Sequence, residues 1–262
     1  MLNITYHYVG REENLKGISI EKFTTQLDKF RENYKKSEIT LTFDHGTIDH
    51  INYVAPELEK RGMKGLFFIL SMVPEEKQIP IEDKQRRLET LYRKELSKML
   101  CHYLEISYEP EQAKNYLSWF ELYSLEERYL RYLRDKKVSA KRYHNFIDGF
   151  FKETFGDEKK FAEEEYLNWE HIIDLDKRGH IIGSHSHYHI GDTKDFKKSI
   201  DLIKEKIKKK VNYISYPNGV KKISDEDLKK LGIKIAYTTK QEEGIGPFQV
   251  QRVDCNQLNF LH

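Results

Sequence analysis

The chain has 262 residues, 38% of them hydrophobic and 34% charged, and it is long enough to bury a substantial core in one large domain or two small ones. The 45 Lys and Arg residues nearly balance the 43 Asp and Glu residues, which excludes a nucleic-acid-binding protein defined by bulk positive charge. No apolar stretch approaches the length that crosses a membrane.

The N-terminus and the cysteines bear on the expected location. Residues 1–9 lack the basic segment and the apolar stretch of a secretory signal peptide. Cys101 and Cys255 are too few and too far apart in the sequence for a disulfide framework or a thiolate metal site, and a reducing compartment suits them. We therefore expect a cytoplasmic protein without a membrane span.

The first clear unit along the chain is a β-α-β pattern. Residues 39–43 predict a buried strand, and apolar residues at helical spacing after Gly46 predict a helix that ends near Gly62, with a kink at Pro56. Residues 65–70 predict a second buried strand. This unit favours a parallel sheet or barrel, with functional groups at the carboxyl ends of the strands.

A helical block then interrupts the alternation. From residue 74 to residue 165 the pattern is helical and rich in Tyr, Phe, Lys and Glu, and residues 124–127 resemble a capping box that opens one helix. One apolar stripe comprises Tyr143, Phe146, Ile147, Phe150 and Phe151. We expect an inserted helical subdomain whose aromatic residues pack in a core; stacking of a few exposed rings on sugars is the alternative.

The alternation of helices and strands resumes after the insertion. The expected helices are residues 169–178, a segment with Phe196, Ile200, Ile203 and Ile207 on one face, and residues 224–232; the expected strands are residues 180–183, 212–216, 233–237 and 248–253. Residues 1–73 and 166–262 would then form one α/β barrel around the insertion.

Two polar clusters follow strands of this expected barrel. Asp44 and His45 come directly after residues 39–43, and His185 and His189 follow residues 180–183. Because the carboxyl ends of parallel strands meet at one edge, the four side chains are expected to share one site. Three imidazoles and a carboxylate can supply the ligands of one metal ion and a base.

These segments resemble motifs of the polysaccharide deacetylase family, also called the NodB-homology or carbohydrate esterase family 4 group. Residues 42–46, Thr-Phe-Asp-His-Gly, match the family's Thr-Phe-Asp-Asp-Gly motif at four places, and residues 185–189 match its His-Ser/Thr-x-x-His motif in full. The resemblance covers residues 5–73 and 166–254. It implies a distorted (β/α) barrel with fewer than eight strands and metal-dependent removal of an N- or O-acyl group from a sugar.

The resemblance also implies roles for single residues. Asp44 matches the family's general base, and His185 and His189 match its two metal-binding histidines. Ser186 matches the small hydroxyl residue that supports the loop between those histidines.

The third metal ligand of the family is an aspartate, and His45 stands at its position here. Three histidines with one open coordination position can hold a catalytic zinc ion, and a neutral imidazole favours borderline metals over Mg²⁺ or Ca²⁺. We therefore expect one divalent ion, Zn²⁺. In the alternative, His45 points away, the site stays empty, and the chain is a degenerate homologue.

Residues 216–219, Tyr-Pro-Asn-Gly, resemble the core of a third motif, in which a backbone N–H after the proline helps to hold the oxyanion. Tyr216 and Asn218 are therefore the expected substrate and oxyanion residues. The family usually carries an arginine where Ser215 stands. Arg252, on the last expected strand, is a substitute that could orient Asp44; its alternative role is a surface salt bridge.

The general acid of the family has no clear counterpart in this sequence. His7, His187 and His262 are the available histidines, and alternation predicts that His187 points away from the metal candidates. His7 follows an N-terminal strand and is the preferred candidate.

The sequence therefore predicts a cytosolic deacetylase that acts on an acetylated sugar or sugar-linked precursor of a surface polysaccharide. A catalytically disabled carbohydrate-binding or assembly protein is the alternative, and deformylation of a formamido sugar would use the same groups. The helical insertion is a candidate surface for a homo-oligomer.

Overall fold

The computed structural model describes residues 1–10, 17–118, 123–239 and 246–258. The chain folds as two compact units. One contains residues 1–78 together with residues 159–262, and the other contains residues 79–158. The helical unit is therefore shorter at both ends than the predicted insertion of residues 74–165.

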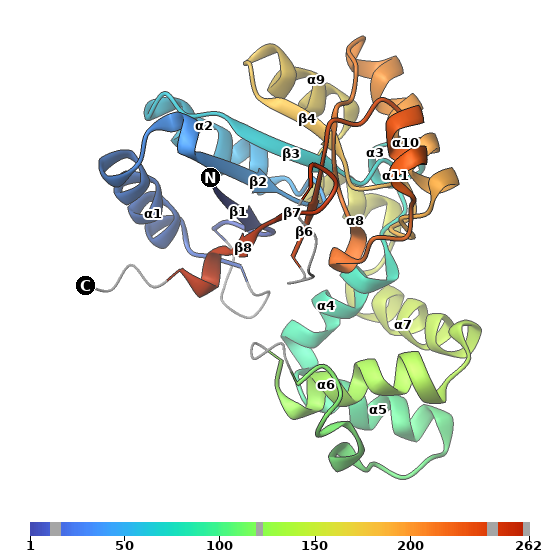
Figure 1. Cartoon of the computed structure of the whole chain (residues 1–262). Helices are drawn as coiled ribbons and strands as arrows, with labels where there is room; N and C mark the ends of the chain where they lie inside the picture. The colour runs from blue at the N-terminus through green and yellow to red at the C-terminus, as the bar shows by residue number, and fades with distance from the viewer. Residues whose placement is uncertain (11–16, 119–122, 240–245, 259–262) are drawn as a thin grey trace. The chain divides into compact units, whose positions relative to one another are not determined.

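The first unit is a parallel sheet curled into a nearly closed barrel (Figure 1). Its strands are β1 (Leu2–Tyr6), β2 (Ile39–Phe43), β3 (Gly65–Ile69), β4 (Ile181–Ser184), β5 (Tyr213–Ser215), β6 (Ile235–Thr238), β7 (Val250–Gln251) and β8 (Val253–Asp254). All neighbours pair in parallel, in the order β7-β6-β5-β4-β3-β2-β1-β8. The predicted distorted (β/α) barrel is confirmed.

The barrel closes through a single short segment of chain. Strands β7 and β8 are separated only by Arg252, whose backbone N–H donates a 2.9 Å hydrogen bond to the carbonyl of Thr238. Strand β7 pairs with β6, whereas β8 pairs with β1 at the other edge of the sheet. One segment of chain therefore supplies the last strand at both edges. The sheet formed by the described residues has eight strands, whereas the resemblance implied fewer than eight.

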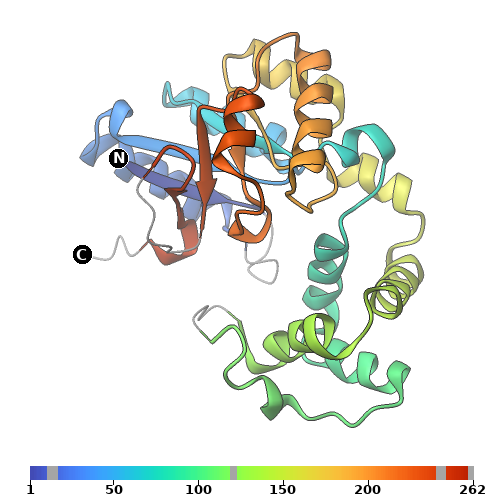
Figure 2. The same ribbon diagram turned by 45° about the vertical axis from the view of Figure 1, so that its right-hand side comes forward.

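Helices surround the sheet in the order that a β-α alternation requires. They are α1 (Ile20–Asn33), α2 (Ala55–Lys60), α3 (Met72–Glu76), α8 (Glu158–Glu165), α9 (Trp169–Lys177), α10 (Thr193–Ile207) and α11 (Asp225–Lys230), with a π-helical turn at His50–Val54 and 3₁₀ turns at Lys36–Glu38, Pro217–Gly219 and Cys255–Gln257. Helices α9 and α10 pack against each other and against β4 (Figure 2). The faces of the parallel sheet are thus covered, as buried strands require.

Two details of these helices differ from the sequence expectation. Helix α1 was not predicted, although Ser19 caps it and Phe23, Leu27 and Phe30 recur on its buried face at helical spacing. Residues 50–60 form one continuous helical stretch, in which the π-helical turn at His50–Val54 leads directly into α2. Pro56 lies just after this turn, where the helix changes from π-helical to α-helical geometry.

Close packing of strand β3 against β4 requires a glycine at position 183. A Cβ atom built on Gly183 would lie 2.6 Å from Cδ1 of Phe68, so no larger residue fits without moving that buried ring. Phe68 is fully buried and pairs with Gly183 in the parallel register. This contact fixes the end of β4 immediately before His185.

The second unit is helical. It contains α4 (Ile81–Tyr92), α5 (Glu95–Leu104), α6 (Leu125–Tyr132) and α7 (Ala140–Phe155), with a 3₁₀ turn at Pro110–Ala113 and a π-helical turn at Leu133–Lys137. The capping box is present, because Ser124 accepts from the N–H of Glu127 and the Glu127 side chain accepts from the N–H of Ser124. Four stripe residues of α7 are buried, namely Tyr143, Phe146, Ile147 and Phe151, in agreement with core packing.

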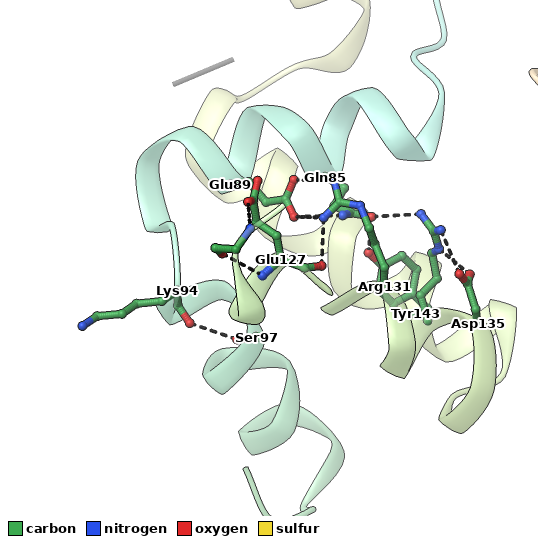
Figure 3. Close-up of polar contacts among 10 residues, drawn as sticks. Gln85, Glu89, Lys94, Ser97, Glu127, Arg131, Asp135 and Tyr143 are labelled. Carbon is green, nitrogen blue, oxygen red and sulfur yellow. Dashed lines mark hydrogen bonds and ion pairs between the residues drawn. The ribbon is translucent and has the colours of Figure 1, made fainter. Parts of the chain in front are cut away.

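A network of polar side chains is buried among the helices of this unit (Figure 3). Glu89 on α4 and Arg131 on α6 form a bidentate ion pair, with N–O distances of 2.7 and 3.0 Å. Gln85 donates to Glu89 and accepts a 2.6 Å hydrogen bond from the hydroxyl of Tyr143. Burial alone would lower the pKa of Arg131, but the paired carboxylate of Glu89 raises it above the ordinary value. The network ties three helices together in one register.

No helix among the described residues is long and apolar enough to cross a membrane.

Candidate metal centre

Three imidazoles meet at the carboxyl ends of β2 and β4. His45 follows β2, and His185 and His189 follow β4. One ring nitrogen of each lies within 4.8 Å of the others, and the ring centroids are 5.0 to 5.3 Å apart. All three side chains are buried. The side chain of His45 therefore lies beside the other two imidazoles and does not point away.

The backbone at these residues adopts a conformation that L-amino acids rarely take. His45, Ser186 and His189 have φ angles of 73°, 70° and 62°, in the left-handed region. A non-glycine residue there costs on the order of 1–3 kcal/mol and persists only when its surroundings hold it in place. Three of the nine non-glycine residues with positive φ in the described part of the chain are therefore two of the candidate ligands and Ser186, which directly follows the third.

Asp44 is paired with Arg252 inside the barrel. The guanidinium donates from Nη1 to Oδ1 and from Nη2 to Oδ2, each at 2.7 Å, and Nη1 also donates to Thr42 Oγ1 at 3.1 Å. The side chains are only 2% and 1% exposed, so the alternative of a surface salt bridge is wrong. Burial alone would raise the pKa of Asp44, but the positive charge of Arg252 holds it well below its ordinary value.

The position of Arg252 explains how it reaches Asp44. It occupies the break between β7 and β8, where the closing segment passes from one edge of the barrel to the other. Its side chain thus enters the barrel interior from the strand next to β1 and approaches the end of β2. The double hydrogen bond fixes the plane of the Asp44 carboxylate.

Ser215, at the end of β5, connects the carboxylate to one imidazole. Its hydroxyl donates to Asp44 Oδ1 at 3.2 Å and lies 2.6 Å from His185 Nδ1, and its carbonyl oxygen lies 3.1 Å from the same nitrogen. With the hydroxyl proton directed at Asp44, the His185 Nδ1–H donates to both oxygens of Ser215. The other ring nitrogen, Nε2, then carries the lone pair that can bind a metal.

The contacts of Ser215 with Asp44 and His185 were not predicted from the sequence. The sequence showed only that a serine stands where the related family usually has an arginine. Its position as the last residue of a strand was a usable signal, because strand ends of a parallel barrel converge on the same site.

His7 lies at the end of β1, beside the imidazole cluster. Its ring centroid is 5.5 Å from that of His45, and its side chain is half-buried. Its backbone carbonyl lies 3.1 Å from His50 Nε2 and accepts a 3.4 Å hydrogen bond from Thr47. The loop after β2 therefore holds the backbone of His7 in place.

The other two histidines considered for the general acid differ in placement. His187 points away from the three imidazoles, since its Nδ1 lies 2.8 Å from Ser71 Oγ and its Nε2 lies 2.8 Å from Glu76 Oε1. His262 lies outside the described residues. Of the two that the structure describes, His7 is the one that lies beside the imidazole cluster.

Tyr216 and Asn218 flank Pro217 beside the site, but they differ in what they can offer. Tyr216 is buried, its hydroxyl donates to the carbonyl of Phe248 at 2.8 Å, and its backbone N–H donates to the carbonyl of Tyr237 at 3.0 Å. Both donors are therefore used within the fold, and the expected contact of Tyr216 with substrate stays a prediction.

Asn218 is exposed and has a φ angle of 54°. The hydrogen bonds within the turn are donated by Gly219 and Val220, so they do not use the N–H of Asn218. Asn218 therefore remains the candidate donor to an oxyanion.

The residues present fit a zinc-type ion. The cluster offers three imidazole nitrogens and no carboxylate, it is buried, and Ser215 orients one of its rings through the nitrogen that would not bind the ion. Neutral imidazoles suit Zn²⁺, whereas Mg²⁺ and Ca²⁺ prefer oxygen ligands. A histidine hydrogen-bonded in this way is typical of metal sites in proteins.

Solved structures share this fold. The deacetylase PplD of Streptococcus pyogenes, in complex with acetate, matches with a TM-score of 0.56 and 14% identity over 97% of this chain and 91% of that one. A de-N-acetylase from Aggregatibacter actinomycetemcomitans matches with 0.55 and 14% over 98% and 95%, and IcaB from Ammonifex degensii with 0.53 and 16% over 96% and 90%. No protein-family model and no curated protein matches the sequence.

At these identities the comparison establishes the fold. The chain has the architecture of the polysaccharide deacetylases, as the resemblance of its motifs predicted. The parallel barrel agrees with that resemblance. The matches extend over nearly the whole chain, whereas the resemblance of the motifs covers residues 5–73 and 166–254.

Proposed function

We propose that the protein is a metal-dependent carbohydrate deacetylase that hydrolyses the amide bond of an acylated amino sugar. The observation that supports this most strongly is the convergence of His45, His185 and His189 beside Asp44, at the strand ends of a deacetylase-type barrel. The three histidines hold one divalent ion, Zn²⁺. When bound, the ion polarises the acyl carbonyl and lowers the pKa of a water molecule towards neutrality.

Asp44 accepts the proton of the attacking water. Its Oδ1 already accepts hydrogen bonds from Arg252 and Ser215, whereas Oδ2 accepts only from Arg252 among the described residues. A carboxylate oxygen has two lone pairs, so Oδ2 has one available for the water. Because Arg252 keeps the pKa of Asp44 low, this group is a carboxylate at every pH at which the enzyme would work.

The backbone N–H of Asn218 stabilises the oxyanion that forms when the carbonyl is attacked. Pro217 and the left-handed conformation of Asn218 direct this turn, and the turn's own hydrogen bonds do not compete for the donor. The hydroxyl of Tyr216, the residue before this turn, donates a hydrogen bond to the backbone carbonyl of Phe248 and so holds the start of the turn in place.

His7 donates a proton to the departing amine. An amine that leaves without protonation is a very poor leaving group, so a general acid contributes typically 10²–10⁴-fold to the rate. His7 is half-buried beside His45, so it can exchange protons with solvent and still reach the reacting group. Its protonated form is the one required at the start of each turnover.

The substrate that we propose is an N-acetylated sugar, or a sugar-linked precursor of a surface polysaccharide, in the cytoplasm. One neighbour with the same fold was solved with acetate and another is a de-N-acetylase, which supports an acetyl group over a formyl group. The helical unit of residues 79–158 is a candidate surface for self-association. The alternative of a disabled barrel gains no support, because His45 lies within the imidazole cluster.

The test is acetate release from acetamido sugars by the purified protein, with and without added zinc. We expect zinc-dependent release by wild type and none by His185→Ala, which removes one ligand. Formate release from formamido sugars, in place of acetate, would identify the deformylase. A wild-type protein that binds zinc and hydrolyses neither class would refute the proposed activity.

A further inference from the structure

The loop that carries His185 and His189 is built around one buried carboxylate that belongs to neither the metal ligands nor the catalytic groups. We infer that Asp195, in the first turn of α10, is a positioning residue that holds residues 185–191 in the metal-binding shape before any metal arrives. The inference rests on the proposed metal-binding role of the two histidines. It concerns the state of the loop in the metal-free protein.

The carboxylate of Asp195 accepts four hydrogen bonds from the backbone of this loop. Oδ1 accepts from the N–H groups of His187 and Tyr188, at 3.2 and 2.7 Å. Oδ2 accepts from the N–H groups of Ile190 and Gly191, both at 2.9 Å. The four donors lie on both sides of His189 in the sequence. A single side chain therefore fixes the chain immediately before and after a proposed metal ligand.

Such a loop needs an anchor of this kind. Ser186, His189 and Gly191 have φ angles of 70°, 62° and 80°. Three of the six consecutive residues 186–191 therefore adopt the left-handed backbone conformation. In this conformation successive N–H groups turn inward and cannot pair with a neighbouring strand. Hydrogen bonds to an ionised carboxylate are roughly twice as strong as neutral ones, and Asp195 is only 5% exposed. Asp195 thus supplies the acceptors that the loop conformation demands.

The opposite side of the loop is held by the segment that begins α3. Ser71 and Met72 donate backbone hydrogen bonds to the carbonyls of Ser186 and His187, both at 3.3 Å. The ring of His187 lies between Ser71 Oγ and Glu76 Oε1, at 2.8 Å from each. This second clamp holds Ser186 and His187 through the backbone, and Glu76 also accepts from the hydroxyl of Tyr188 at 3.1 Å. Beyond His189, Lys222 donates to the carbonyl of Ile190 at 3.0 Å, whereas Asp195 accepts from backbone N–H groups on both sides of His189.

The variant Asp195→Asn tests the inference at nearly constant volume. The amide keeps one oxygen but directs its NH₂ group at two backbone N–H groups, so two of the four hydrogen bonds are replaced by repulsion between donors. Asp192→Asn is the matched control. Asp192 caps the same helix by accepting from the N–H of Asp195 at 2.9 Å, and asparagine caps a helix about as well as aspartate.

Amide hydrogen exchange of the metal-free proteins is the first measurement. In wild type and Asp192→Asn, we expect the amides of His187, Tyr188, Ile190 and Gly191 to be protected. In Asp195→Asn these four should exchange at least tenfold faster, while the amides of β3 and β4 keep their protection. Equal protection of the four amides in wild type and Asp195→Asn would overturn the inference.

Zinc affinity is the second measurement. We expect Asp195→Asn to bind zinc 10–100-fold more weakly than wild type and Asp192→Asn, as for other groups that orient metal ligands without touching the metal. A residue that merely stabilises the fold would lower the unfolding temperature and leave the zinc affinity of the folded protein unchanged. That result would overturn the positioning role.

The two measurements separate this inference from the proposed function. If wild type binds no zinc but its loop amides are protected through Asp195, the preformed loop stands and the metal-dependent activity fails. If Asp195→Asn does not fold, Asp195→Glu takes its place, since it keeps the charge and displaces the acceptors by one methylene. Faster exchange of the same four amides supports the inference, and unchanged exchange contradicts it.

Discussion

The barrel and the helical unit each bury a bidentate pair of arginine and carboxylate, and the two pairs have different surroundings. Asp44 and Arg252 lie at strand ends, beside three imidazoles and residues with left-handed backbone. Glu89 and Arg131 lie between helices, and their further partners include Gln85, the backbone carbonyl of Glu127 and the aromatic ring of Tyr123. A buried ion pair therefore does not by itself indicate a catalytic site. The neighbouring groups distinguish a catalytic pair from one that only stabilises the fold.

The comparison predicts that neutralising Asp44 lowers the enzymatic activity, whereas neutralising Glu89 leaves the activity of the folded protein unchanged. Asp44→Asn should lower acetate release by about 10²–10⁴-fold, because the proton acceptor is lost. Zinc should still bind, since Asp44 is not among the three ligands. The measurement is the turnover rate of the zinc-loaded variant at saturating substrate. Glu89→Gln is the matched control, and its rate per folded molecule should equal that of wild type. A reduced rate would contradict the claim that only the pair in the barrel takes part in catalysis.

Glu89→Ala should lower the free energy of unfolding of the protein. Removing one partner of a buried ion pair leaves an uncompensated charge and costs roughly 3–5 kcal/mol. Arg131 would keep its place between the helices with no carboxylate opposite its two Nη groups. Urea unfolding followed by circular dichroism measures the loss. A change below about 1 kcal/mol would mean that the helical unit does not depend on its buried pair.

His45→Asp restores the residue that the related family carries at this position. An aspartate at the end of β2 places an oxygen ligand and a negative charge in the imidazole cluster, so we expect a shift in preference from zinc towards harder ions such as Mn²⁺. His45→Ala is the control and should bind zinc more weakly than either protein. The measurement is the ratio of zinc to manganese affinity by competition titration. An unchanged ratio would show that position 45 does not contact the metal.

The smallest expected effect is on the pH dependence of stability. Burial lowers the pKa of His180 below 6.5, although its hydrogen bond to Glu59 opposes this. The unfolded chain therefore binds the proton first as the pH falls. The stabilising contribution of the neutral ring is complete above about pH 6.5 and declines as the pH falls below that value, by at most about 1.4 kcal/mol per pH unit for one proton.

His180→Gln should flatten this part of the stability curve relative to wild type. The pKa of Glu59 is lowered from 4.5, chiefly by hydrogen bonding to Arg178, so its own contribution is lost only at lower pH. His50, His185 and His187 also have pKa values lowered by burial, but they are common to both proteins, so the difference between the two curves from pH 6.5 to pH 5 reports His180. The measurement is the free energy of unfolding of both proteins across that interval. Parallel curves would contradict the assignment of His180 as neutral in the folded state.

The parts of the fold that the sequence predicted are those with a strong local pattern. The strand of residues 39–43 and the lead-in to His185 are runs of apolar residues that end in polar clusters, and the rule for parallel strands brings those clusters together. Helix α1 also has a cap and a regular apolar face, so the sequence contained the signals that predict it.

Other features depend on contacts that no local pattern contains. The side chain of His45 could point either way until its left-handed backbone was known. Arg252 reaches Asp44 because the last strand breaks at that residue and pairs with both edges of the barrel. The link from Ser215 to His185 and Asp44 joins residues 30 and 171 positions apart. These arrangements are set by closure of the barrel.

The central claim is that three imidazoles bind one ion beside a carboxylate held by arginine. Its most direct test is a crystal structure grown with excess zinc, in which anomalous scattering locates the metal. The account predicts one peak, roughly 2.0–2.1 Å from one nitrogen each of His45, His185 and His189. No peak among the three rings, or a zinc ion held by His185 and His189 with the side chain of His45 turned away, would contradict it.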